Sequence, residues 1–263
     1  MQIWLANLDG SGLKQVTNLA DGACQPDWSP DGQRLVFVSP CSGLQDDYPG
    51  ASLYLIGADG TGLVPLVTLP GGDYEPAWSP DGGQIAFTSL RDNGVPHIYL
   101  YNLADHTATR LSRPVNHERQ PAWSPDGKRL AYQTTRLGEP QIWVMSADGE
   151  DAREFSTLAG GFEWMPVWSP DGSIIVFSKG NPPLLTARQF GEPLAREFPV
   201  SERVFPAEMA DFSPDGWWLI FEMRKQGQIG LFRMQRNGSS LTPLLADDPY
   251  LNFHPAWRPD VSP

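Results

Sequence analysis

Residues 25–39 of the chain read QPDWSPDGQRLVFVS. The first run ends in an aromatic residue, Trp28. Ser-Pro-Asp-Gly then supplies a proline that holds φ at about −65° and a glycine that tolerates positive φ, which is the composition of a tight turn. An alternating apolar run follows, as in a strand with one buried face. The stretch therefore predicts a β-hairpin.

This hairpin recurs along the chain at a nearly constant interval. Related stretches cover residues 75–89, 120–134, 165–178 and 209–221, and a partial copy lies at 254–260. The aromatic residue before the turn recurs at spacings of 50, 45, 45, 44 and 45 residues, at Trp28, Trp78, Trp123, Trp168, Phe212 and Trp257. Such a period is typical of folds in which each repeat is one small sheet.

Each repeat contains the pattern of four strands. In residues 75–112, EPAWS and QIAFTS flank the SPDG turn, and HIYLYNL and TATRLS flank a second turn at ADH. Six such units predict an all-β, six-bladed β-propeller with four-stranded antiparallel blades. We expect each repeat aromatic to be wedged between neighbouring blades and to bury roughly 150–250 Å².

The two ends of the chain predict how the ring closes. Residues 3–8 and 13–17 resemble third and fourth strands, and 254–257 resemble a first strand. We therefore expect a single domain, 1–263, whose closing blade is built from both termini and either lacks one strand or is filled irregularly. No signal peptide pattern is present, and Met1 opens within a strand pattern, so we expect an excised domain or a processed form.

The composition excludes two classes of partner. The 263 residues carry a formal net charge of −12 at pH 7, whereas phosphate backbones and anionic membranes need clustered Lys and Arg. No apolar run reaches the roughly 18 residues of a membrane span. We expect a monomer whose partner is a protein or peptide, without nucleic acid binding and without membrane insertion.

The two cysteines are Cys24 and Cys41. Folding the first hairpin about its SPDG turn places them roughly opposite each other, at a separation that suits a disulfide. Two free thiols fit the sequence equally well. A disulfide would imply an oxidising compartment.

The repeated WSPDG, followed by an apolar strand and a DG turn, resembles the propeller repeat of the TolB-like family over nearly the whole chain. The resemblance implies six blades, a protein-binding role and a periplasmic or extracellular location. Similar repeats occur in the propellers of prolyl-oligopeptidase-type enzymes, in oligogalacturonate lyases and in extracytoplasmic parts of bacterial sensors. The chain has no region that matches the N-terminal domain of TolB.

The loops between fourth and first strands are the candidate binding site, because varied loops on a rigid scaffold commonly carry binding residues. They contain aromatic and charged residues that we expect around the channel mouth of the loop-rich face. The candidates are Tyr74, Glu75, His117, Glu118, Arg119, Glu163, Trp164, Glu208, Phe253 and His254.

The loops between second and third strands add two further features. Arg91, Arg136 and Arg224 recur at equivalent places, and we expect them to pair within the protein rather than with an anionic ligand. Asp46 and Asp47, next to Tyr48, could ligate Ca²⁺, but two side chains are too few to predict a site for an ion that takes six to eight oxygens.

Catalytic patterns are weak by comparison. No GxSxG nucleophile turn occurs, and the four histidines, His97, His106, His117 and His254, lie in separate segments without metal-ligand spacing. We therefore expect a non-catalytic binding module without metal or cofactor, such as the sensing or docking part of a larger protein. The alternative is a propeller enzyme, a polysaccharide lyase or a peptidase-associated propeller, in which Glu75, Glu118, Glu163 or Glu208 acts on a saccharide or peptide.

Overall fold

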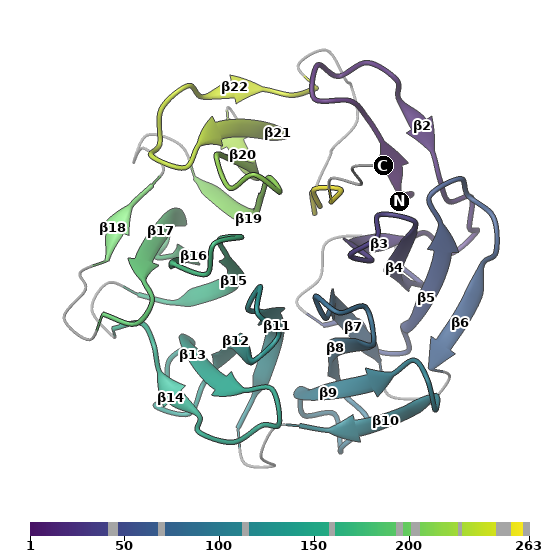
Figure 1. The fold of residues 1–263 in the computed structure, drawn as a ribbon, viewed down its shortest axis with the longest axis horizontal. Helices are drawn as coiled ribbons and strands as arrows, with labels where there is room; N and C mark the ends of the chain where they lie inside the picture. Colours follow the sequence, from purple (N-terminus) through teal and green to yellow (C-terminus); the bar gives the residue numbers. More distant parts are fainter. Residues whose placement is uncertain are drawn as a thin grey trace. The chain divides into compact units, whose positions relative to one another are not determined.

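The computed structural model describes residues 1–41, 47–67, 72–111, 116–157, 161–192, 197–200, 206–225, 228–245 and 254–259. The regular elements in these residues are all β-strands, and consecutive strands of a sheet lie side by side (Figure 1). The chain divides into two compact units, residues 1–121 with 259–263 and residues 122–258. Within the described part, no helix is long and apolar enough to cross a membrane.

Unit 1 contains one two-stranded sheet followed by two four-stranded antiparallel sheets. The two-stranded sheet consists of β1 (Trp4–Leu5) and β2 (Lys14–Gln15). The next sheet consists of β3 (Cys24–Trp28), β4 (Arg34–Ser39), β5 (Ser52–Gly57) and β6 (Val64–Val67). The third consists of β7 (Asp73–Trp78), β8 (Gln84–Ser89), β9 (His97–Asn102) and β10 (Thr107–Arg110).

Three further four-stranded sheets follow, and the boundary between the units falls inside β11. The first consists of β11 (Glu118–Trp123), β12 (Arg129–Thr134), β13 (Gln141–Ser146) and β14 (Arg153–Glu154). The second consists of β15 (Glu163–Trp168), β16 (Ile174–Lys179), β17 (Leu184–Gln189) and β18 (Phe198–Pro199). The third consists of β19 (Ala207–Phe212), β20 (Trp218–Lys225), β21 (Gln228–Gln235) and β22 (Thr242–Pro243).

These sheets confirm the predicted class of four-stranded antiparallel blades and correct the blade count, because the described residues form five complete blades rather than six. The closing blade expected from both termini is incomplete. The N-terminal residues contribute only β1 and β2, and residues 254–259 lie outside any strand. A strand is defined by a hydrogen-bonded neighbour, and residues 254–259 pair with no strand among the described residues.

The SPDG turns are built from local hydrogen bonds. In the first of them, the Ser29 hydroxyl donates to Asp31 Oδ1 (2.5 Å) and accepts from the Arg34 N–H (2.9 Å). Gly32 has a φ of 60°, which favours glycine. The Ser29 hydroxyl and the Gln33 N–H hold the pKa of Asp31 below its usual value. The same serine–aspartate pair recurs in each of the five complete sheets, so the repeated sequence encodes the turn.

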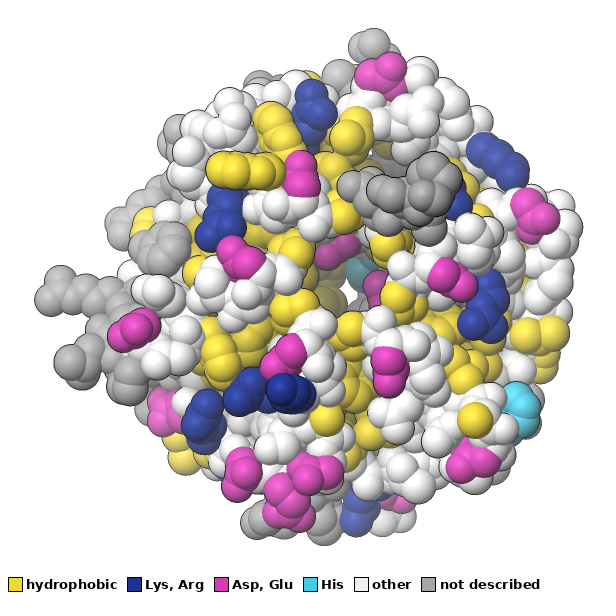
Figure 2. All heavy atoms as spheres, viewed as in Figure 1, with side chains coloured by type: hydrophobic (Ala, Val, Ile, Leu, Met, Phe, Trp, Pro, Cys, Tyr) yellow, Lys and Arg dark blue, Asp and Glu magenta, His cyan; other side chains and the backbone are white. Residues whose placement is uncertain are grey.

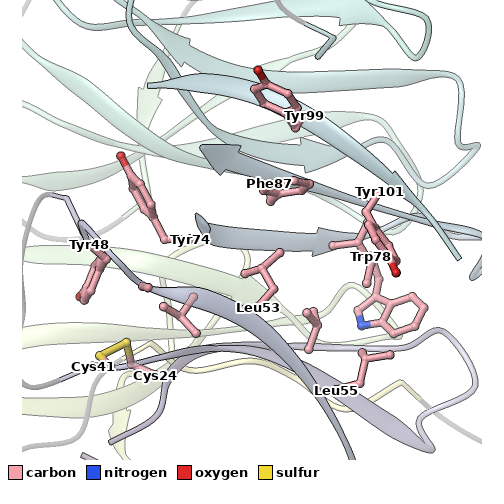
Figure 3. Packing of buried hydrophobic residues seen from close by; sticks show 14 of the residues in the cluster. Cys24, Cys41, Tyr48, Leu53, Leu55, Tyr74, Trp78, Phe87, Tyr99 and Tyr101 are labelled. Atoms are coloured by element: carbon pink, nitrogen blue, oxygen red, sulfur yellow. A yellow bond between two sulfur atoms is a disulfide. The ribbon is translucent and has the colours of Figure 1, made fainter. Parts of the chain in front are cut away.

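The repeat aromatics pack between consecutive sheets. In unit 1, Trp78 of β7 shares one buried cluster with Val36 and Leu53 of the preceding sheet and with Phe87 of its own sheet (Figure 3). The Arg34 guanidinium lies over the Trp78 ring at 5.2 Å. Burial of a large aromatic ring on both sides joins the two sheets through the hydrophobic effect.

Unit 2 repeats this packing. Trp168 clusters with Ile142 of the preceding sheet and Phe177 of its own, and its indole N–H donates to the Ala122 carbonyl (3.2 Å). Phe212 is buried against the sheet that precedes it in the same way. Of the other repeat aromatics, Trp28 is buried, and Trp123 and Trp257 are half-buried.

Cys24 and Cys41 form a disulfide, with a Cα–Cα distance of 5.9 Å. Cys24 lies opposite Val38 on β4, and the Cys41 N–H donates to the Asp21 carbonyl (2.8 Å). The bond thus closes the open end of the first hairpin, beside Tyr48 (Figure 3).

Candidate functional site

Each repeat bends at the same point of its first strand. The residue three positions before the repeat aromatic has a left-handed backbone, with φ between 50° and 57°, at Gln25, Glu75, Gln120, Met165, Met209 and His254. The strand registers shift at this point in four of the sheets, as expected for a β-bulge. A bulge changes the direction of its side chain, and in unit 1 it directs the side chains of Gln25 and Glu75 toward the next repeat.

In unit 1 the bulge residues connect consecutive first strands. The Gln25 carbonyl oxygen Oε1 accepts from the Glu75 N–H (2.9 Å), and Glu75 Oε2 accepts from the Gln120 N–H (3.0 Å). Glu75 Oε2 also accepts from the Thr88 hydroxyl (2.7 Å). The Glu75 side chain therefore holds two repeats in register rather than standing free at the surface.

A polar cluster extends from this connection to solvent. We call Asp47, Tyr74, Glu75 and Arg119 the loop-end cluster. The Tyr74 hydroxyl donates to Asp47 Oδ1 (2.7 Å), and an Arg119 guanidinium nitrogen lies 3.3 Å from Glu75 Oε1 and 3.5 Å from Asp47 Oδ1. The guanidinium also lies over the Tyr74 ring at 5.6 Å, close enough for a cation–π interaction.

The protonation states of the loop-end cluster are fixed by burial and by charge. Burial raises the pKa of Tyr74 far above its usual value, so the hydroxyl stays protonated and donates. Burial alone would lower the pKa of Arg119, but the Glu75 carboxylate and the other acidic neighbours outweigh it and raise the pKa. Arg119 therefore stays charged while only 17% exposed, beside the half-exposed Asp47 carboxylate.

Three other predicted site residues are buried or half-buried, although they were expected to be exposed at the channel mouth. Glu118 and Glu163 are buried at the start of β11 and β15, in the position that Asp73 holds in β7. Asp73 accepts two hydrogen bonds from Arg91 Nη2 (both 2.9 Å). Trp164 is half-buried opposite Ser178.

Glu163 in unit 2 belongs to a second buried ion cluster. Lys179 Nζ lies 2.6 Å from Glu163 Oε1 and 2.5 Å from Glu197 Oε2. The Ser156 hydroxyl donates to Glu163 Oε2. Glu163 is fully buried, so its ion pair and hydrogen bond lie in the interior of the sheet rather than at the surface.

The three arginines that were predicted to pair within the protein lie in different surroundings. Arg91 pairs with Asp73 and lies over the Tyr99 ring at 4.5 Å. Arg136 lies over the Trp143 ring at 4.7 Å. Arg224 is exposed.

Glu208 and Glu222 are opposite each other on β19 and β20. Glu222 is 2% exposed and accepts from the His254 N–H (2.6 Å). Burial, aided by the Glu208 charge, raises the pKa of Glu222 to about 8, and burial lowers the pKa of His254 to about 4. The two groups are therefore both neutral near pH 7.

The C-terminal segment, residues 254–259, is attached to the last sheet by carboxylates. Besides the Glu222 contact, the Trp257 N–H donates to Asp211 Oδ2 (2.6 Å). In unit 1 the Trp78 N–H donates to Asp27 Oδ2 in the same way (2.6 Å). Asp27 and Asp211 stand directly before the repeat aromatic, where the other repeats carry Ala or Val. The sequence analysis did not single out these two aspartates, although this difference between repeats could have indicated them.

His117 is exposed at the end of the loop before β11, two residues from Arg119. Of the other histidines, His97 is buried in β9 and His106 is exposed in the turn before β10. Phe253 and Asp46 lie outside the described residues. In the described part of the chain, no group of three or more His, Cys, Asp or Glu side chains is arranged to hold a metal ion.

The repeated four-stranded sheets, the bulged first strands and the wedged aromatics define a β-propeller. The chain belongs to the TolB beta propeller domain family, whose model matches residues 1–99 and 89–261. No curated protein matches the sequence.

Solved structures support the same fold. TolB from Acinetobacter baumannii superimposes with a TM-score of 0.82 at 23% identity, over 98% of this chain and 63% of that one. A putative TolB from Agrobacterium tumefaciens gives 0.77 at 20% identity, over 91% of this chain and 86% of that one. Hydrazine synthase from Kuenenia stuttgartiensis gives 0.74 at 16% identity, over 94% of this chain and 42% of that one.

The chain thus spans less than two thirds of the Acinetobacter TolB chain. Identities this low establish the fold alone, and a fold shared by TolB and by a hydrazine synthase does not determine function.

Proposed function

We propose that the chain is a non-catalytic β-propeller module that recognises a protein or peptide through its loops between fourth and first strands and between second and third strands. The observation that carries the proposal is the loop-end cluster. Asp47 comes from a loop between second and third strands, and Tyr74, Glu75 and Arg119 come from the starts of two first strands. Groups already fixed by hydrogen bonds lose little conformational entropy on binding, which favours recognition.

The accessible members of this region are Asp47, whose side chain is 50% exposed, and His117. The buried members, Tyr74 and Glu75, hold them in place. Asp47 is the half-exposed member of its ion pair with Arg119, and an ion pair near the surface contributes only about 0–1 kcal/mol, so a basic group of a partner can replace Arg119 beside Asp47 at little cost.

The charge of the chain favours a basic partner surface. Acidic side chains outnumber basic ones by 31 to 19, and Figure 2 shows acidic side chains spread over the drawn face among basic and hydrophobic ones. Complementary charge mainly raises association rates, so we expect association to slow as salt is added.

We also place the protein outside the cytoplasm, in the periplasm or extracellular space. The Cys24–Cys41 disulfide supports this location, because structural disulfides persist in oxidising compartments. Membership of the TolB propeller family supports the same location.

Affinity capture with photo-crosslinkers at Asp47 and His117, followed by hydrogen exchange on the purified complex, tests the proposed surface. We expect protection of residues 72–75 and 116–120 and at least about fivefold weaker binding of His117→Ala. His106→Ala is the matched control, because His106 is also exposed but lies at the turn between β9 and β10. Binding that is insensitive to His117→Ala and protects other segments would refute the proposal.

A second candidate, an enzyme acting on a saccharide or peptide, is favoured by one observation. Glu222, with a pKa of about 8, stands opposite Glu208, and a carboxyl group that stays protonated near neutral pH can serve as a general acid. Glu222 is nevertheless 2% exposed and already bonded to the His254 N–H. Turnover of an oligosaccharide or peptide panel that is lost in both Glu222→Gln and Glu208→Gln would establish this candidate instead.

A further inference from the structure

The loop-end cluster carries more negative than positive charge. It contains two carboxylates, Asp47 and Glu75, and burial keeps Tyr74 neutral by raising its pKa. Among the described residues, the cation that pairs with these carboxylates is Arg119, whose Nη2 atom lies 3.3 Å from Glu75 and 3.5 Å from Asp47. One guanidinium therefore serves two carboxylates, and one negative charge is in excess.

This excess charge is accessible from solvent at Asp47 and not at Glu75. The Glu75 side chain is 6% exposed, and its Oε2 accepts from the Thr88 hydroxyl (2.7 Å) and the Gln120 N–H (3.0 Å). The Asp47 side chain is 50% exposed, and its Oδ1 accepts from the Tyr74 hydroxyl (2.7 Å). A cation from solution can therefore reach Asp47, whose carboxylate is already held in place by Tyr74.

Asp92 resembles Asp47 in its contacts but differs from it in charge balance. Asp92 Oδ2 accepts from the Tyr99 hydroxyl and from Arg110 Nη1 (both 2.6 Å), and the Asp92 side chain is 36% exposed. This group contains one carboxylate for one guanidinium. The structure thus provides a partly exposed aspartate, bonded to a tyrosine and an arginine, that has no excess charge.

A second cluster with two carboxylates for one cation lies in unit 2 but is closed to solvent. Lys179 Nζ lies between Glu163 and Glu197, whose side chains are 0% and 13% exposed. The contacts of 2.6 and 2.5 Å show that a compact ammonium group fits closely against glutamate oxygens in this fold.

The surroundings of Asp47 favour an ammonium group over a guanidinium. An arginine pairs best with a carboxylate when its planar fork contacts both oxygens. At Asp47 such a fork would lie beside the like charge of Arg119, which is already 3.5 Å from Oδ1. A lysine ammonium is a compact point charge that can pair with a single oxygen, away from Arg119.

We propose that Asp47 binds the ammonium group of a lysine side chain on the partner protein. Each carboxylate of the loop-end cluster then has its own cation, because Arg119 is left to Glu75 and the lysine takes its place beside Asp47. The inference rests on the proposed function, since it names the partner group that this surface recognises. The acidic chain, with 31 acidic and 19 basic side chains, also favours the approach of a lysine-bearing segment.

The test uses the full chain and the synthetic peptide acetyl-KKKK-amide, followed by amide NMR titration of the ¹⁵N-labelled protein. We expect saturable shift changes at the amides of Asp47, Tyr48 and Tyr74. The peptide acetyl-RRRR-amide carries the same charge and should bind roughly 2- to 5-fold more weakly, the size of effect expected for one ion pair near the surface. A peptide of four trimethyl-lysines keeps the charge but has no N–H to donate to Asp47, so it should also bind more weakly.

Matched variants separate the site from the general acidity of the chain. Asp47→Asn should weaken binding of the lysine peptide roughly 2- to 5-fold and remove its advantage over the arginine peptide. Asp92→Asn, which removes the same charge at the balanced group, should leave both affinities unchanged at these amides. No saturable shift at these amides, arginine binding at least as tight as lysine binding, or equal losses in the two variants would each overturn the proposal.

Failure of this inference can be told apart from failure of the proposed function. A captured partner that protects residues 72–75 and 116–120, but binds Asp47→Asn as tightly as the wild type, would overturn the lysine site alone. Failure of the proposed function would instead appear as protection of other segments.

Discussion

Substitution of a single residue in a buried ion pair at the loop ends should strongly lower the free energy of unfolding. Asp73 is 1% exposed and holds Arg91, whose side chain is 10% exposed, by two hydrogen bonds. A buried pair gives little net stability over an apolar pair of the same size, but removal of one partner leaves an uncompensated charge. Such residues therefore tolerate little change for reasons of stability alone.

Asp73→Asn should destabilise the protein by about 3–5 kcal/mol, because the Arg91 charge would stay buried without its counterion. Asp92→Asn is the matched control. Asp92 pairs with Arg110 at 2.6 Å, and both side chains are about one third exposed. Asp92 also accepts from the Tyr99 hydroxyl (2.6 Å), and an asparagine oxygen can still accept this bond. We therefore expect a loss of only about 0–1 kcal/mol. Urea unfolding of both variants measures the difference, and equal losses would contradict the assignment of Asp73 as a buried counterion.

Glu222 should make the protein less stable as the pH rises. Its pKa is about 8 in the folded state and close to the ordinary value of 4.5 when unfolded. Between these values the folded protein holds the extra proton, so the free energy of unfolding falls with rising pH by at most about 1.4 kcal/mol per pH unit. Below about pH 6.5 His254 opposes this trend, because its lowered pKa makes folding less favourable as the pH falls.

Glu222→Gln isolates this contribution. Glutamine keeps an oxygen that can accept from the His254 N–H and cannot ionise. Thermal melts of the variant and the wild type at pH 7 and pH 8 should show a difference in Tm that grows in favour of the variant. At these pH values Asp211, with a pKa of about 6, and His254 no longer titrate. A difference independent of pH would mean that Glu222 is ionised in the folded protein.

At the scale of elements, the hairpin β3–β4 is closed at both ends. The SPDG turn closes one end through the Ser29–Asp31 hydrogen bond, and the Cys24–Cys41 disulfide closes the other. The two closures differ in kind. The turn selects a backbone conformation, whereas the disulfide restricts the unfolded chain.

Replacement of both cysteines by serine should lower the free energy of unfolding by about 3 kcal/mol, the value expected for a closed loop with a sequence separation of 17 residues. Urea unfolding with and without reductant measures this loss. Reductant should reproduce most of the effect in the wild type and have no effect in the double variant. A wild type that reductant leaves unchanged would contradict a structural role for the bond.

At the scale of the whole molecule, stability depends on packing between consecutive sheets. A four-stranded sheet has little core of its own, so each blade is stabilised by its neighbours, as in other repeat folds. The repeat aromatics supply this contact with large apolar rings, and in unit 1 the bulge residues Gln25 and Glu75 supply a second, polar contact. This architecture is typical of the family to which the chain belongs, whereas the partner that we propose would be selected by loops that differ between repeats.

Trp168→Ala should destabilise the protein by about 3–5 kcal/mol, because it leaves a cavity between two sheets. Trp217→Ala, the same substitution at a side chain that is 66% exposed, should change stability by less than about 0.5 kcal/mol. Thermal melts compare the two variants. Similar shifts in Tm would show that the repeat aromatics do not join the blades.

Much of the fold could be predicted from the sequence, because the deciding signals are local. WSPDG encodes its own turn through a serine, an aspartate and a glycine within five residues, and the constant spacing of the aromatics indicates repeated four-stranded sheets. The blade count was predicted less well, since it depends on whether distant segments pair. Residues 254–259 have the sequence of a first strand, but they attach to the last sheet through Asp211 and Glu222 instead of a ladder.

The candidate site was predicted only in outline. Their positions in the loops predicted Tyr74, Glu163 and His117 alike as binding residues. Of these three, only His117 is exposed, and the other two are buried. The sequence by itself determined the repeat and its turns, because these depend on neighbours within one hairpin, and the constant spacing of the aromatics predicted where the wedges between sheets lie. Only the tertiary structure decided which charges are buried, because burial depends on side chains tens of residues apart.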